Sequence, residues 1–138
     1  MKRFIGYSTG ALAKGDFRRG LDLLRRHGID VVELSALRDT ELVPFLDDLD
    51  GLDLSFASYL SFHAPSRFET LSEEEVANLL RRLLPRRWPI IVHPDAIIDP
   101  RHWGGFGKWL CIENMDKRKP VGRTADELRT VFRIFPDA

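Results

Sequence analysis

The sequence predicts an α/β domain built from about five parallel βα units that follow one another along the chain. Short β-rich apolar runs alternate with segments whose apolar residues recur at helical spacing, the order typical of parallel sheets. The 138 residues suffice for one core and are too few for two, so we expect a single domain over residues 1–138. Right-handed crossovers would bring the carboxyl ends of all strands to one edge, where α/β proteins gather their functional groups.

Five segments are expected to form strands. Each is rich in apolar or β-branched residues, and proline closes the third and the fourth. In chain order they are residues 4–8 (FIGYS), 30–35 (DVVELS), a strand within 54–65 (LSFASYLSFHAP), 89–94 (PIIVHP) and 109–114 (WLCIEN).

The first two helices are expected between strands one and three. Asp16 can cap a helix through FRRGLDLLRRHG, which Gly28 would end. Thr40 is expected to cap a short helix, ELVPFLDDL, with Pro44 in its first turn, where a missing N–H costs little.

Two later helices carry a capping-box pattern, in which a hydroxyl and a glutamate three residues on satisfy each other's amides. Ser72 with Glu75 begins EEEVANLLRRLL, and Thr124 with Glu127 begins ADELRTVFRIF. The glycine-rich connection DPRHWGGFGK is expected to hold at most a short helix. Neither GxGxxG nor GxxxxGK[ST] follows the first strand, which disfavours a dinucleotide-binding fold.

Composition argues against several classes of partner. Twenty-one basic and 21 acidic side chains give no net charge, so we expect no nucleic-acid partner, and no apolar stretch reaches the ~20 residues of a membrane span. The single cysteine, Cys111, excludes an intrachain disulfide and fits a reducing cytoplasm, where we expect the protein.

Ionisable residues stand near the ends of four predicted strands. They are Glu33, His63, His93 and Glu113, which Asn114 follows. Two imidazoles and a carboxylate form a ligand set for zinc or manganese, and a carboxylate in such a site can also exchange protons with substrate. Ordinary alternatives exist: a strand-end histidine can cap a loop, Glu33 can pair with an arginine, and Glu113 can be satisfied by backbone donors.

Positive charge follows Glu113 directly. Lys117, Arg118, Lys119 and Arg123 lie in the loop at the edge where the candidate ligands would meet, and there they would favour an anion such as phosphate. The alternative is a solvated run of charge.

Three of these strand ends resemble successive motifs of the xylose-isomerase-like TIM barrels. The segments are SFHAP (61–65), IVHPD (91–95) and LCIENMD (110–116), and the longer IENMDKRKPVGRT resembles bacterial sugar-phosphate isomerase/epimerase-like members. The resemblance covers five strands. It implies a partial (β/α) barrel, incomplete relative to the eight strands and ~250 residues of a closed barrel.

The resemblance also implies roles. His63, His93 and Glu113 would bind a divalent metal (Zn, Mn or Mg), with Glu113 and His93 as catalytic residues. A sugar or sugar phosphate would contact Glu33, Asn114, Lys117, Arg118, Lys119 and Arg123. Because later strands of such barrels supply further ligands, we expect the chain to be part of a longer protein and, in isolation, to be inactive and able to lose its metal. Open sheet edges could promote self-association.

Two other functions remain open. A zinc-dependent apurinic/apyrimidinic endonuclease uses the same three motifs, although zero net charge argues against a DNA groove. A non-catalytic binding or assembly module would reuse the face without metal. Salt-dependent binding to abasic DNA would favour the endonuclease. Ligand binding that needs no metal and is unchanged by Glu113→Gln would favour the module.

Overall fold

The five predicted strands form one parallel sheet in strand order β1-β2-β3-β4-β5. The computed structural model describes residues 5–138, so Phe4, the first residue of the predicted first strand, lies outside the described part. The observed strands are shorter than the predicted segments. They are β1 (Tyr7–Ser8), β2 (Val31–Ser35), β3 (Tyr59–His63), β4 (Ile90–Val92) and β5 (Leu110–Ile112).

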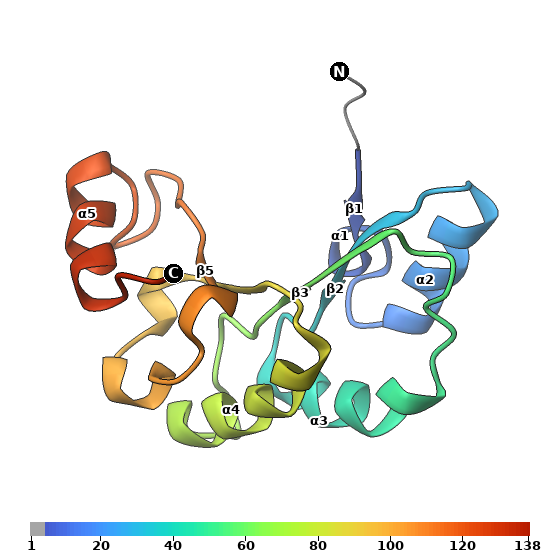
Figure 1. Cartoon of the computed structure of the whole chain (residues 1–138), viewed down its shortest axis with the longest axis horizontal. Coiled ribbons are helices and arrows are strands. Elements are labelled where there is room, and N and C mark those ends of the chain that lie inside the picture. Colours follow the sequence, from blue (N-terminus) through green and yellow to red (C-terminus); the bar gives the residue numbers. More distant parts are fainter. Residues whose placement is uncertain (1–4) are drawn as a thin grey trace.

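Helices alternate with these strands and lie outside the sheet, where α2, α3 and α4 succeed one another from one end of the sheet to the other, and α5 lies at the end far from α2 (Figure 1). The sheet is open, with β1 and β5 as its edge strands. No helix within residues 5–138 has the length and apolar character needed to cross a bilayer. The helices are α1 (Thr9–Ala13), α2 (Phe17–Arg26), α3 (Asp39–Asp48), α4 (Glu73–Leu80) and α5 (Ala125–Ile134).

Two predicted helix starts are confirmed. The Asp16 side chain accepts a hydrogen bond from Arg19 N at 3.0 Å and caps α2. At α4, Ser72 and Glu75 form the complete capping box, in which each side chain accepts from the other residue's backbone N–H.

The predicted start of α3 is wrong by two residues. The helix begins at Asp39, not after Thr40, and its N-cap residue is Arg38, whose side chain makes no capping hydrogen bond. Asp39 is fixed at this position because its carboxylate accepts from the backbone N–H groups of residues 69, 70 and 71, as well as from Thr40 N at 2.9 Å. Pro44 therefore lies in the second turn rather than the first.

The capping box predicted for α5 forms only in half. Thr124 Oγ1 accepts from Glu127 N at 3.2 Å, but the Glu127 carboxylate accepts from Arg123 N at 2.8 Å and pairs with the Arg123 guanidinium instead of returning to Thr124. Helix α1, with five residues, was not predicted.

The sheet has a covered face and an open face. Residues paired across parallel strands point the same way, so register assigns each side chain to a face. The covered face packs on the helices, and its buried part is apolar; it carries Val32, Leu34, Phe62, Ile90, Val92 and Leu110, all buried. The open face carries polar residues toward the carboxyl ends of the strands.

The last third of the chain is less deeply packed. The glycine-rich connection forms two 3-10 turns, Pro100–Trp103 and Gly107–Trp109, which agrees with the expectation of at most a short helix. Trp103 is buried in the core. Helix α5 has no buried residue, and the chain rejoins the core through Phe135.

Candidate metal site

Three adjacent strands deliver the candidate ligands to one place. His63 is the last residue of β3, His93 directly follows β4, and Glu113 directly follows β5. Register pairs His63 with Ile91 and Ile91 with Cys111, so alternation carries His93 and Glu113, each two residues further on, to the open face that His63 shares. The expected convergence of strand ends therefore occurs at these three residues.

The three side chains lie within ligand distance of a common centre. Glu113 Oε2 is 3.0 Å from His63 Nε2 and 3.0 Å from His93 Nε2, and one ligand atom from each residue lies within 4.8 Å of the others. The imidazole rings are perpendicular, with centroids 5.0 Å apart. Both histidine side chains are largely buried, whereas 40% of the Glu113 side chain is exposed. The group forms a candidate metal site that opens to solvent on the glutamate side.

The hydrogen bonding of His63 favours a cation at the centre. His63 Nδ1 lies 2.9 Å from the carbonyl oxygen of Ala64, which can only accept, so Nδ1 carries a proton. In a neutral ring Nε2 then holds a lone pair, and that lone pair faces Glu113 Oε2. Two lone pairs at 3.0 Å repel each other unless a proton or a metal ion lies between them.

His93 is a poor source of that positive charge. Burial lowers the pKa of its imidazole below the ordinary value; the neighbouring His63 and Lys119 lower it further, and the Glu113 and Asp95 carboxylates oppose the change. A ring that stays neutral offers a lone pair to a metal ion, as metal-binding histidines do. A His₂Glu donor set is one that zinc accepts, with a remaining position for water or substrate.

A second layer of side chains lies behind His93. Asp95 belongs to the 3-10 turn Pro94–Ala96, which begins immediately after His93. Its Oδ1 is 3.7 Å from His93 Nδ1, and its Oδ2 is 2.9 Å from Lys119 Nζ. Asp95 was not among the residues predicted for the site, although its position two residues after a candidate ligand was a usable signal.

The loop after Glu113 is held against this second layer by a close backbone approach. Met115 N donates to Gly122 O at 2.8 Å and closes the loop. Gly122 has a φ of 86°, and a Cβ there would lie 2.5 Å from Pro94 Cγ, so glycine is required on both counts. The loop therefore carries Lys119 to Asp95.

Most of the predicted anion-binding residues pair with acidic neighbours. Arg118 pairs with Asp116 at 2.6 Å, Arg123 with Glu127 at 2.6 Å and Lys119 with Asp95 at 2.9 Å. Within residues 5–138 Lys117 forms no ion pair and is exposed. Exposed ion pairs contribute little and exchange readily, so Arg118 and Arg123 can still turn to another anion.

Two further predicted residues lie apart from the three ligands. Glu33 is on the open face, but β2 continues to Ser35, and it is Ser35 that pairs in register with His63. Glu33 thus lies one side-chain level nearer the amino ends of the strands, beside Ser61. Asn114 is exposed, and strand alternation directs it away from the face of Glu113.

Ser35 is a site neighbour that sequence reasoning missed. Its hydroxyl is 2.6 Å from Ser8 Oγ, and its N–H donates to Thr9 Oγ1 at 3.0 Å, so hydroxyl groups line the open face next to His63. Extending the alternation from Glu33 by two residues would have found it.

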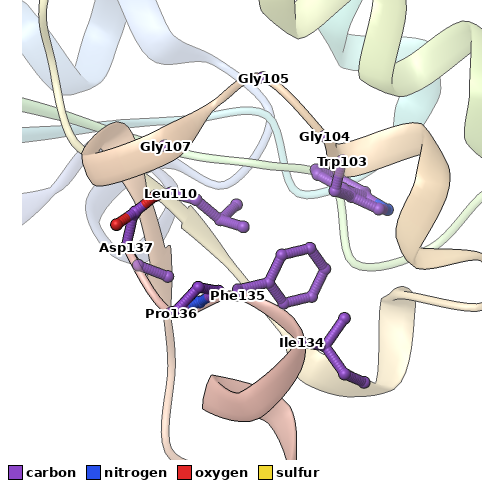
Figure 2. Close-up of a pocket in the computed structure, with 10 residues that line it drawn as sticks. Trp103, Gly104, Gly105, Gly107, Leu110, Ile134, Phe135, Pro136 and Asp137 are labelled. Atoms are coloured by element: carbon purple, nitrogen blue, oxygen red, sulfur yellow. The ribbon is translucent and has the colours of Figure 1, made fainter.

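The glycine-rich connection borders a separate cavity of about 290 Å³, which the three candidate ligands do not line. The Phe135 ring lies between Ile134 and the side chains of Trp103 and Leu110 (Figure 2). Because Leu110 belongs to the covered face, this cavity is on the helix side of the sheet, away from the metal site. The chain matches no protein-family model, no curated protein and no solved structure.

Proposed function

We propose that the protein is a divalent-metal-dependent isomerase or epimerase that acts on a sugar or sugar phosphate. The observation that carries the proposal is the meeting of one ligand atom each from His63, His93 and Glu113 within 4.8 Å at the carboxyl ends of three adjacent parallel strands. The resemblance of the same three strand ends to xylose-isomerase-like barrels points to this reaction class.

The donor chemistry supports the metal. His63, with its proton on Nδ1, presents Nε2 to the centre, and Glu113 adds one carboxylate oxygen. A bound divalent ion would supply Lewis-acid polarisation of a sugar oxygen. Zinc and manganese both suit imidazole and carboxylate ligands.

Glu113 is the residue best suited to move a proton. Its Oε2 faces both imidazoles, and in the described part of the chain its Oε1 takes part in no hydrogen bond. With 40% of the side chain exposed, the Glu113 carboxylate is accessible to a substrate that approaches from the open face. Lys117 is the first candidate to receive a phosphate group, since Arg118, Lys119 and Arg123 would have to exchange an existing partner.

Metal binding is the first test. The native gene product, its intact mass determined, would be stripped with chelator and titrated with Zn²⁺, Mn²⁺ and Co²⁺ by calorimetry. Glu113→Gln should lower affinity by at least about 100-fold, because it removes a charged ligand. Glu74→Gln, an exposed carboxylate in the first turn of α4, is the matched control and should bind as wild type. Equal affinity of the two variants would contradict the site.

The reaction is tested by hydrogen exchange at carbon. The metal-loaded protein would be incubated with aldose and ketose phosphates in D₂O, and deuterium at the sugar carbons followed by NMR. We expect incorporation with wild type and Glu74→Gln and none with Glu113→Gln. Metal binding without exchange on any sugar would overturn the isomerase proposal while leaving the site, and cleavage of abasic DNA would then identify the endonuclease.

A further inference from the structure

We propose that Asp95 and Lys119 form a positioning pair that sets the orientation and tautomer of His93, so that its Nε2 is offered to a metal. This inference rests on the proposed metal site and deepens it. It concerns side chains behind the ligands, and it gives Lys119 a different task from anion binding.

The first observation is a pair of buried polar atoms that face each other. His93 Nδ1 and Asp95 Oδ1 are both inaccessible to solvent, and neither has a hydrogen-bond partner in the described structure. They are 3.7 Å apart, about half an ångström beyond a good hydrogen bond. Buried polar groups are rarely left unpaired, and the pairing nearest at hand is a proton on Nδ1 shared with Oδ1.

The second observation is the cation on the far side of the carboxylate. Lys119 Nζ binds Asp95 Oδ2 at 2.9 Å, in a position where only 15% of the Asp95 side chain is exposed, so the buried carboxylate has a cationic partner. With Oδ2 occupied, Oδ1 is left for the imidazole. The backbone closure at Gly122, against Pro94, carries Lys119 to this place, and the pair is thus built by two loops that follow β4 and β5.

The two histidines are therefore held by different devices. His63 Nδ1 is bound to the carbonyl oxygen of its own neighbour, Ala64, which no side-chain substitution removes. His93 depends on a side chain, which can be replaced. An outer carboxylate bound to a ligating imidazole fixes the ring and raises its basicity, and its loss commonly costs 10–100-fold in metal affinity.

Three substitutions in the full-length native protein test the pair by Zn²⁺ titration. Asp95→Ala should weaken Zn²⁺ binding by about 10–100-fold. Asp95→Asn should recover part of that loss, because its amide oxygen still accepts from Nδ1. Asp116→Asn removes an exposed carboxylate of the same loop region, which within residues 5–138 forms an ion pair only with Arg118, and this variant should bind as wild type.

Imidazole ¹⁵N NMR supplies a readout that a merely structural role would not move. In Asp95→Ala the fraction of neutral His93 with its proton on Nδ1 should fall relative to wild type, while the His63 signals keep the Nδ1–H form. The comparison is made in metal-free as well as Zn²⁺-loaded protein, at a pH where both rings are neutral. It therefore remains decisive even if wild type binds no metal and the proposed function fails.

Two results would overturn the inference. One is an unchanged His93 tautomer in Asp95→Ala, which would show that the carboxylate does not hold the ring. The other is an equal change at His63, which would show that the substitution disturbs the whole site.

Discussion

Buried carboxylates at the starts of α3 and α4 and the carboxylate after β5 have opposite surroundings. Asp39 is fully buried, and its oxygens accept from the backbone N–H groups of residues 40, 69, 70 and 71 and from the Thr70 hydroxyl. Glu73 accepts from Ile98 N, Asp99 N and the Trp103 indole. Glu113 faces two imidazole nitrogens instead, and no backbone donor reaches it within residues 5–138.

The difference separates structural from chemical carboxylates. Backbone N–H groups cannot change their protonation, so Asp39 and Glu73 are satisfied permanently and fasten one loop each to a helix start. The partners of Glu113 can give up a proton or accept a metal. Substitutions at the first pair should therefore change stability, and those at Glu113 should change binding.

Asp39→Asn is expected to have the largest effect on stability. The amide removes the charge and turns an N–H₂ group toward existing donors, so we expect a loss of about 3 kcal/mol or more in the free energy of unfolding. Urea unfolding of metal-free protein measures it. Asp47→Asn, on the exposed side of the same helix, should change stability by less than about 0.5 kcal/mol. A loss at Asp47 equal to that at Asp39 would refute the distinction.

The stabilisation by Asp39 should also depend on pH. Burial acts to raise the pKa of Asp39, but hydrogen bonds from Leu71, Thr70 and Glu69 outweigh it, and the pKa of the folded protein lies below the ordinary value. The unfolded chain then binds more protons, so the stabilisation is complete above the unfolded pKa of about 3.9 and is lost as pH falls through the folded value. The advantage of wild type over Asp39→Asn should narrow between pH 6 and pH 3. A constant gap would contradict the lowered pKa.

Glu73→Gln should have a smaller effect. The amide keeps one oxygen for Ile98 N or the Trp103 indole, so we expect a loss of about 1–2 kcal/mol. Trp103→Phe removes the indole donor. The loss of stability in the double variant should be smaller than the sum of the losses in the two single variants. Strict additivity would mean that the 2.7 Å contact between Trp103 Nε1 and Glu73 Oε1 contributes nothing.

Glu113→Gln should change the stability of metal-free protein least, by less than about 0.5 kcal/mol. Its oxygens lack fixed donors in the described structure, so removing the charge leaves no backbone group unpaired. Thermal unfolding with excess chelator measures this. Addition of Zn²⁺ should then raise the stability of wild type more than that of Glu113→Gln, because an ion that binds the folded state stabilises it more the more tightly it binds. A large loss without metal would place Glu113 with Asp39 and Glu73.

Sequence reasoning reached the sheet and the three ligands because both depend on local patterns. Apolar runs marked the strands, and a residue at the end of such a run is carried to the site by strand direction alone, as with His63, His93 and Glu113. The start of α3 was missed because Asp39 is fixed by donors some thirty residues away, at Glu69, Thr70 and Leu71. Such a partner has no periodic signal.

The surroundings of the site were harder to predict for the same reason. Lys119 and Asp95 are 24 residues apart and meet only because Gly122 closes its loop on Pro94. The sequence of a basic loop does not show whether its residues form ion pairs with distant carboxylates or are free to bind an anion. Ser35 is the last residue of the predicted strand 30–35, and it was missed because only the ionisable residue near that strand end, Glu33, was considered. One step of alternation decides which residue lies beside His63.

The shallow packing of α5 has a consequence for how the protein opens. A helix without a buried residue needs little free energy to detach, so its amides should exchange with solvent faster than those of β3 and β4. The loop that carries Lys119 is closed by its own hydrogen bond between Met115 and Gly122, upstream of that helix. The last turns of the chain can thus unfold and refold many times while the ligand cluster stays assembled.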